Sequence, residues 1–464
     1  MICAVVTGCA VGPDYERPDL LLPEEWPEEI GESMATDLDI GAWWQRYGDP
    51  VLDRLVEEAL ENNLDVGLAA ARVGEARTIL GFRDAERYPT IGAFAEVERD
   101  DPGLTGSGPG TEMVVAGNLS YEVDLWGRLS RDAESARANL LGTAYARDAV
   151  RLAVVTDVVA SYFDYRAVAE QIEITEDTIA SREESLEVER SRYRSGATTE
   201  LAVRQAEAEL QTSRAELPGL RAEAMRGRRA LAILVGDSGA VLRGLDDLGD
   251  HGLPSLPDGV TELPALLPSD LVERRPDIRA AEAFLVAANA DIGVARAEWF
   301  PRVDLLAVAG TGATAAGDLF TGPATLWELF GSVSAPILDF GRRQASISEA
   351  EVGREIAELQ YRATILESFR EVGDAWTLLE SAAERLEARI AEVEALVDVV
   401  DLAERRYRGG YSPYLEVLDA RRALFSAELS RTAAARDRLV ATATLYKALG
   451  GGWDLDDEQR ALMN

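Results

Sequence analysis

Two acidic residues, Glu416 and Asp419, have the spacing that most directly suggests chemistry. They follow Ser412 at the predicted start of a helix, where a separation of three residues places both on one face. If oligomerisation turns this face inward, the carboxylates form a ring that could bind cations and gate a passage. The chain repeats internally, but the equivalent positions of the first copy hold Ala202 and Gln205, so the acidic pair occurs only once. The alternative is an ordinary solvated acidic face, since the chain has 83 acidic residues.

The two cysteines, Cys3 and Cys9, both lie within the first nine residues. Small residues directly before Cys9, after an apolar run, are typical of a bacterial lipoprotein signal. This pattern predicts cleavage before Cys9 and acylation of that residue, and two acyl chains anchor a protein stably. The apolar run is short and lacks a charged segment before it, so a simple apolar N-terminus is the alternative.

The sequence contains few of the residue patterns that enzymes use for catalysis. The only histidine is His251, and no G-x-S-x-G motif, phosphate loop or metal-ligand cluster is present. We therefore predict no enzyme activity, no metal and no cofactor other than the lipid on Cys9. The 47 basic residues leave a net charge of −36, which argues against nucleic acid as a partner. The acidity reflects either habitat and genome composition or an acidic lumen that favours cations.

Long helices must position the acidic pair. The range 337–412 contains no proline, and its apolar residues recur every three or four positions. This spacing predicts a helix over 342–408, roughly 100 Å long, that packs lengthwise against other helices. A second helix is predicted over 128–194. Each is followed by a turn with glycine, where the chain leaves the helix; the turn residues are Arg194 and Gly196 in the first case, and Arg408 and Gly410 in the second.

An internal repeat organises the chain. Trp126-Gly127-Arg128 matches Phe340-Gly341-Arg342, and Arg87-Tyr88-Pro89 matches Trp299-Phe300-Pro301 at nearly the same separation in sequence. Each copy has the pattern of a helix, a β-hairpin and two long helices. The predicted segments are a truncated signal (1–9), an extended segment (10–50), repeat 1 (51–236; hairpin about 89–126, long helices about 128–235), a linker (237–264), repeat 2 (265–454; hairpin about 301–340, long helices about 342–450) and a tail (455–464).

Apolar and polar residues alternate in both predicted hairpins, for example along 91–98. Four strands per chain cannot close a barrel, and an open sheet edge cannot sit in lipid. If the strands lie in a membrane, three chains would therefore share twelve strands. The alternative is a pair of exposed hairpins that cap a soluble helical bundle. The sequence has no run of eighteen apolar residues, so it predicts no membrane-spanning helix.

Several of these features together resemble the TolC-type outer-membrane efflux proteins. They are the VTGC ending at Cys9, the segment VGPDYERP at 11–18, the doubled unit and the segment YRGGYSPYLEVLDA at 407–420. The resemblance extends from Cys9 to Trp453. Within the family, it is greatest to the lipoprotein (NodT-like) branch associated with resistance-nodulation-division pumps.

The resemblance implies a mostly α fold with a β part: a homotrimer with a 12-stranded transmembrane β-barrel, continued by a long α-helical periplasmic barrel. It implies a lipid-anchored outer-membrane protein that contacts a periplasmic adaptor and an inner-membrane pump. Such a protein is a passive, gated conduit that exports small molecules such as drugs and toxic compounds. The alternatives are a conduit for secreted proteins or metal cations, and a coiled-coil tether of the envelope without a channel.

The resemblance also assigns roles to individual residues. Glu416 and Asp419 match an acidic constriction at the periplasmic end of the tunnel. The turns with Gly196 and Gly410, flanked by Arg194 and Arg408, match the tips where adaptor hairpins dock, and Cys9 matches the acylated residue. Ser412 lies where some members carry a basic gating residue, which this chain lacks.

Overall fold

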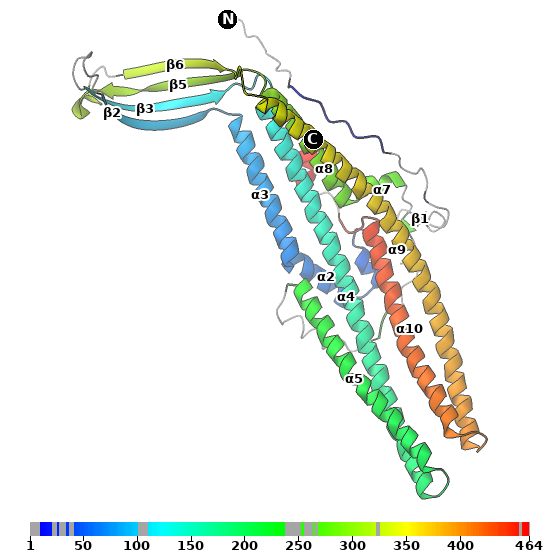
Figure 1. The fold of residues 1–464 in the computed structure, drawn as a ribbon. Helices are drawn as coiled ribbons and strands as arrows, with labels where there is room; N and C mark the ends of the chain where they lie inside the picture. The colour runs from blue at the N-terminus through cyan, green and yellow to red at the C-terminus, as the bar shows by residue number, and fades with distance from the viewer. Residues whose placement is uncertain are drawn as a thin grey trace.

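The structure is a computed structural model, and Figure 1 shows an elongated molecule with a sheet at one end and two helix tips at the other. It describes residues 10–20, 26, 34–36, 41–100, 110–236, 252–254, 263–264, 268–321, 325–453 and 457–463. The predicted signal at 1–9, with Cys9, lies outside these residues, as does most of the linker at 237–264. The mostly helical fold with a smaller β part is confirmed.

Helices form most of the described chain. The two longest, α4 (Arg128–Arg194) and α9 (Arg342–Arg408), cover the same residues as the two predicted long helices. Each is followed by a shorter antiparallel helix, α5 (Glu200–Leu234) or α10 (Tyr414–Ala448). The remaining helical segments are η1 (Trp43–Tyr47), α2 (Pro50–Asn62), α3 (Leu64–Glu86), α7 (Pro268–Arg274), α8 (Pro276–Ala297), η3 (Ala316–Asp318) and α11 (Asp457–Met463).

Acidic and amide side chains fix where the helices begin. Asp49 and Asn63 accept hydrogen bonds from the first backbone N–H groups of α2 and α3. Asp124 does the same for α4, with 3.1 Å to the nitrogen of Leu129. The residue before α4, Gly127, has a positive φ of 77° and lies directly against Ala10 of the N-terminal segment.

Four antiparallel strands form one sheet in the order β2-β3-β5-β6. The strands are β2 (Thr90–Asp100), β3 (Gly110–Glu122), β5 (Arg302–Ala313) and β6 (Thr325–Ser334). The register aligns Ile91 with Leu119, Leu119 with Ala307 and Ala307 with Leu329, so these residues share one face. That face is apolar across all four strands, whereas the acidic residues of the strands lie on the other. A separate short pair joins β1 (Met34–Thr36) and β4 (Leu263–Pro264) in parallel.

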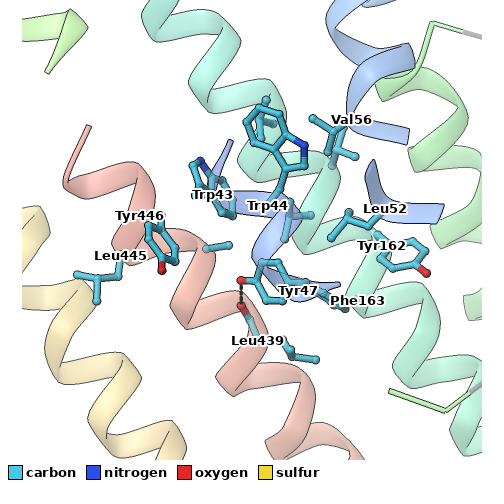
Figure 2. Packing of buried hydrophobic residues seen from close by; sticks show 14 of the residues in the cluster. Trp43, Trp44, Tyr47, Leu52, Val56, Tyr162, Phe163, Leu439, Leu445 and Tyr446 are labelled. Atoms are coloured by element: carbon cyan, nitrogen blue, oxygen red, sulfur yellow. Dashed lines mark hydrogen bonds between the residues drawn. The ribbon is translucent and has the colours of Figure 1, made fainter. Parts of the chain in front are cut away.

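The main hydrophobic core lies midway along the helices, where the N-terminal segment crosses α4 and α10 (Figure 2). Trp43 is fully buried and stacks on Tyr446 of α10 at 5.4 Å between ring centroids. The hydroxyl of Tyr47 donates a hydrogen bond of 2.9 Å to the carbonyl of Leu439. Because η1 contacts helices of both repeats, this core holds the two halves of the chain together.

The predicted seam of α9 is buried within the chain only in its first half. Val372 is fully buried and Leu379 is 5% exposed, but Ile390 and Val397 are 42% and 50% exposed. Within a single chain, this face is therefore closely packed in its first half and more open in its second half. Beyond Ala382, most apolar residues of α9 are half-buried or exposed, but Ala403 is buried where the helices meet near the tips.

Candidate functional site

The turns between the long helices use the same hydrogen bonds in both repeats. Gly196 has a φ of 76° and donates to the carbonyl of Tyr193 at 3.0 Å, while Ala197 donates to Arg192 at 2.8 Å. Gly410, with a φ of 74°, repeats this pattern at the equivalent place in the second turn. These bonds are those of a Schellman motif, which needs a left-handed residue and therefore favours glycine. Both turns lie at the end of the molecule away from the sheet (Figure 1).

A small apolar cluster, the tip cluster, packs the two turns' helices against each other. Its buried members are Leu186 of α4, Ala202, Ala206 and Leu210 of α5, Ala403 of α9, and Tyr414, Val417, Leu418 and Ala420 of α10. Burial raises the pKa of Tyr414 to about 12, because the phenolate would lose its hydration. The tip of one hairpin is therefore held to the tip of the other.

Glu416 and Asp419 lie on the exposed side of α10, beside the tip cluster. The carboxylate of Glu416 is 3.6 Å from the Arg406 guanidinium, and that of Asp419 is 3.3 Å from the Arg422 guanidinium. The side chains of the two acids are 45% and 60% exposed. The structure thus places both predicted gate residues at the tip and on the surface, each with an arginine beside it.

A chain of charges that sequence reasoning missed lies behind Asp419. Arg422, which pairs with Asp419, also pairs with Glu209 of α5. Glu209 in turn is 3.2 Å from Arg182 of α4, whose side chain is only 8% exposed and also donates to the Glu209 carbonyl at 2.7 Å. Burial lowers the pKa of Arg182, and the Glu209 carboxylate opposes this effect. The alternating charges connect α10 to both helices of the first hairpin.

Tyr407 makes a second connection between the hairpins. Its hydroxyl donates to the Glu189 carboxylate of α4 at 2.7 Å, and Glu189 is only 2% exposed. Burial, together with this bond, raises the pKa of Tyr407. The guanidinium of Arg192 lies 4.5 Å from the centre of the Tyr407 ring. The Tyr407 ring therefore lies between the two hairpins, and its hydroxyl is bound to the buried Glu189 carboxylate.

The remaining predicted tip residues are exposed. Arg194 pairs with Glu187 at 3.2 Å, and Arg408 pairs with Glu404. The guanidinium groups are free to reorient, since the two arginine side chains are 66% and 69% exposed. Ser412 carries no charge, and the bases nearest the acidic pair are Arg406 and Arg422 instead.

The residue after Cys9 lies far from the tips, where the sheet joins the helices. Ala10 contacts Gly127, and the Val11 nitrogen donates to the Trp126 carbonyl at 3.0 Å, where the sheet meets α4. The segment VGPDYERP continues from there along α8: Gly12 meets Gly293, and Arg17 binds Glu282 at 2.6 Å. This segment is therefore a strap across both repeats.

None of the described helices has the length and apolarity needed to cross a membrane. Within the same residues, no group of three or more His, Cys, Asp or Glu side chains is arranged to hold a metal ion.

Comparison with known proteins identifies the class. The family model described as "Outer membrane efflux protein" matches residues 55–237 and 267–451, which correspond to the two repeats. The chain belongs to this family, so the predicted resemblance is confirmed. It is an outer-membrane channel protein of an efflux system.

Particular relatives cover nearly the whole chain. The cation efflux system protein CusC of Escherichia coli O6:H1 is 32% identical over 459 residues, with 97% of each chain covered. The solvent efflux pump outer membrane protein SrpC of Pseudomonas putida is 34% identical over 460 residues, with 97% of this chain and 96% of SrpC covered. The solved structure of the outer-membrane channel OprN superposes with a TM-score of 0.87 at 29% identity, covering 96% of this chain and 100% of OprN.

Proposed function

We propose that this protein is the outer-membrane conduit of a tripartite efflux system and acts as a homotrimer. The observation that carries the proposal is the four-stranded sheet. One of its faces is apolar across all strands, and its edge strands β2 and β6 have no partner in the described part of the chain. Backbone groups on such edges cannot remain unpaired in lipid. Three chains that pair edge to edge give a closed barrel of twelve strands, an even number in the known range.

The helices continue this barrel as a tunnel on the periplasmic side. Apolar residues exposed on one chain support lengthwise packing against a neighbouring chain, among them Leu68 and Phe82 of α3 and Val352, Ile356 and Leu359 of α9. Energy comes from an inner-membrane pump, and a periplasmic adaptor contacts the turns with Gly196 and Gly410. The chain itself has no catalytic role in this proposal.

The tip contacts form the gate. The bond from Tyr407 to Glu189 and the charges connecting Asp419 to Arg182 hold the second hairpin against the first. In a trimer, Glu416 and Asp419 would form a ring of carboxylates around the axis, which favours cations over anions. Opening then requires the hairpins to separate and these bonds to break.

A lipid on Cys9 would anchor the chain at the level of the sheet. The support is the position of Ala10, the next residue, at the junction of the sheet with α4. Two acyl chains there would enter the membrane next to the proposed barrel.

Small organic compounds are the proposed cargo, and metal cations are the second candidate. Relatives of similar identity are named for solvent efflux in one case and cation efflux in the other. The two candidates can be distinguished in a bacterium that lacks its own channel and is complemented with this protein and its pump. Its susceptibility to organic solvents and to metal salts would be measured. Rescue from organic solvents supports the first candidate, and rescue from metal salts alone supports the second.

Conductance of the purified protein in planar bilayers tests the function itself. We expect trimers by native mass measurement, and a small cation-selective current that increases in the double variant Glu416→Ala/Asp419→Ala. Arg406 and Arg422 are unchanged in this variant, so cation selectivity should decrease as the current rises. Trimers that conduct in neither form would favour the alternative of an envelope tether.

A further inference from the structure

The sheet carries a second group of large apolar side chains, on the face opposite the one that the proposed function places in lipid. In a closed barrel this second face lines the interior, which is polar in membrane barrels. Its residues near both ends of the strands include acids, such as Glu98 and Glu122. Between these ends lies a group that we call the inner patch: Phe94 of β2, Leu306 and Val308 of β5, and Leu326 and Phe330 of β6.

The strand register brings the members of the inner patch together. Phe330 lies directly opposite Leu306, and Val308 lies opposite Glu328. Directly opposed side chains have Cβ atoms about 4.5–5.5 Å apart, close enough to contact each other. One row across all four strands has no polar side chain, and it consists of Phe94, Ala116, Gly310 and Leu326. The apolar surface therefore continues from β2 to β6.

The inner patch is not covered by other parts of the chain. The side chains of Phe94, Leu306 and Phe330 are 38%, 36% and 52% exposed. Burial of such side chains is favourable, so a group of them on a surface that faces water marks a contact site. In the interior of a channel, the molecules that pass through can make this contact.

Acidic residues lie within and beside the inner patch. Glu328 is flanked on the same face of β6 by Leu326 and Phe330, each about 6–7 Å away along the strand. Glu96 lies two residues from Phe94 on the same face of β2, at the same spacing. Each edge strand of the sheet therefore presents a phenylalanine and a carboxylate side by side.

The acids at the base of this face differ from those at the patch in their partners. Glu122 is 2.9 Å from the Arg128 guanidinium and also pairs with Arg302, so its charge is neutralised. Glu96 and Glu328 form no ion pair within the part of the chain that the structure describes. Their negative charges are therefore available to a molecule from solution.

Unpaired carboxylates beside exposed aromatic and aliphatic side chains complement one class of molecule, the organic cation with aromatic or other apolar groups. We propose that the inner patch, with Glu96 and Glu328, binds such cations on their way through the barrel. The apolar groups of the ligand would cover the patch, and its charge would lie near a carboxylate and the Phe330 ring. An inorganic cation would gain nothing from the apolar side chains, and the carboxylates would repel an organic anion. This inference rests on the proposed function and adds residues that select among small organic compounds.

Block of the single-channel current tests the site. The probes are tetraphenylphosphonium, which has aromatic rings around its charge, and tetramethylammonium, which has the charge without rings. Both are added to the protein in planar bilayers in the Glu416→Ala/Asp419→Ala background, which removes the other proposed site for cations. We expect tetraphenylphosphonium to block at concentrations lower by about tenfold or more, because only this cation can bury the patch. Equal block by the two cations would overturn the proposal.

Variants of the patch separate binding from simple obstruction of the channel by a large ion. In the same background, Phe330→Ser should raise the concentration of tetraphenylphosphonium needed for block by roughly 5- to 30-fold, since one aromatic contact is lost. Block by tetramethylammonium should not change. Glu328→Gln should also weaken the block by tetraphenylphosphonium. Its matched control is Glu112→Gln, which removes a carboxylate from the same face outside the patch, opposite Glu98, and should have little effect.

The outcomes distinguish the site from the conduit. Channels that conduct but show the same block by tetraphenylphosphonium with and without Phe330→Ser would overturn the site and leave the proposed function intact. Leu306→Ser, the residue opposite Phe330, provides the same test if Phe330→Ser does not insert. Equal effects of Glu328→Gln and Glu112→Gln would overturn the role of Glu328, because the acids would then act only through the net charge of the interior. A protein that conducts in none of these forms would contradict the proposed function instead.

Discussion

The hydroxyl of Tyr407 offers the sharpest test of the proposed gate. The substitution Tyr407→Phe removes one oxygen and keeps the ring between Arg192 and Tyr414, whose ring centroid is 5.2 Å away. The hydrogen bond that is lost ends on Glu189, which is 2% exposed and cannot recruit water freely. A hydrogen bond to a charged group contributes about 1.5–3 kcal/mol.

If this bond exists only when the tips are closed, its loss shifts the ratio of open to closed tips by roughly 10- to 150-fold per chain. Single-channel recording measures that ratio as the fraction of time spent open. The matched control is Tyr193→Phe, the equivalent residue of repeat 1, which is 46% exposed. The control should behave as the wild type. Equal open fractions for the two variants would refute the assignment of Tyr407 to the gate.

Three further predictions follow from the backbone and from burial. Gly410→Ala forces a side chain onto a φ of 74° and should lower stability by about 1–2 kcal/mol, whereas Gly353→Ala, inside α9 with open space around it, should raise it by about 1 kcal/mol. Thermal unfolding by circular dichroism should show these opposite shifts, and equal shifts would contradict the turn geometry. Gly12→Ala would place a carbon 2.6 Å from Gly293, so hydrogen exchange in 10–20 should become faster while the tips stay unchanged; unchanged exchange in the strap would contradict the close approach. Burial raises the pKa of Tyr414 from 10.0 to about 12, so its neutral form stabilises the tip fully below pH 10 and this stabilisation is lost as the pH rises through 12. An absorbance titration of wild type minus Tyr414→Phe should show a step near pH 12, and a step near 10 would disagree with its burial.

The elements were predictable from sequence because their signals are local. A proline-free run with apolar residues every three or four positions is sufficient to predict α9. What such a stripe packs against is not local information. Ile390 and Val397 continue the pattern of Val372 yet stay exposed in the chain, since the pattern is the same for a partner in the same chain or in another.

The charge network of the tip could not be predicted for a related reason. Glu209 lies 27 residues from Arg182 and 213 from Arg422, and with 83 acids and 47 bases nearly every charge has an opposite charge nearby in sequence. Burial selects the pairs that matter, and burial follows from how the hairpins pack. The strap differs from the charge network because its segment was recognisable as a sequence motif. Its contact between Gly12 and Gly293 of α8 could not be predicted, because it joins residues far apart in the sequence.

Comparing the repeats separates the residues that the fold needs from those that the proposed gate needs. Gly196 and Gly410 are the same residue with nearly the same φ, because both turns must reverse a long helix. Ala202 and Glu416 occupy equivalent positions, yet Ala202 is 5% exposed in the tip cluster while Glu416 is on the surface. The second hairpin can carry an acid there only because this position is not needed for packing. A trimer would thus present six tips of two alternating kinds, and only three of them would carry the acidic pair Glu416 and Asp419 that we propose as part of the gate.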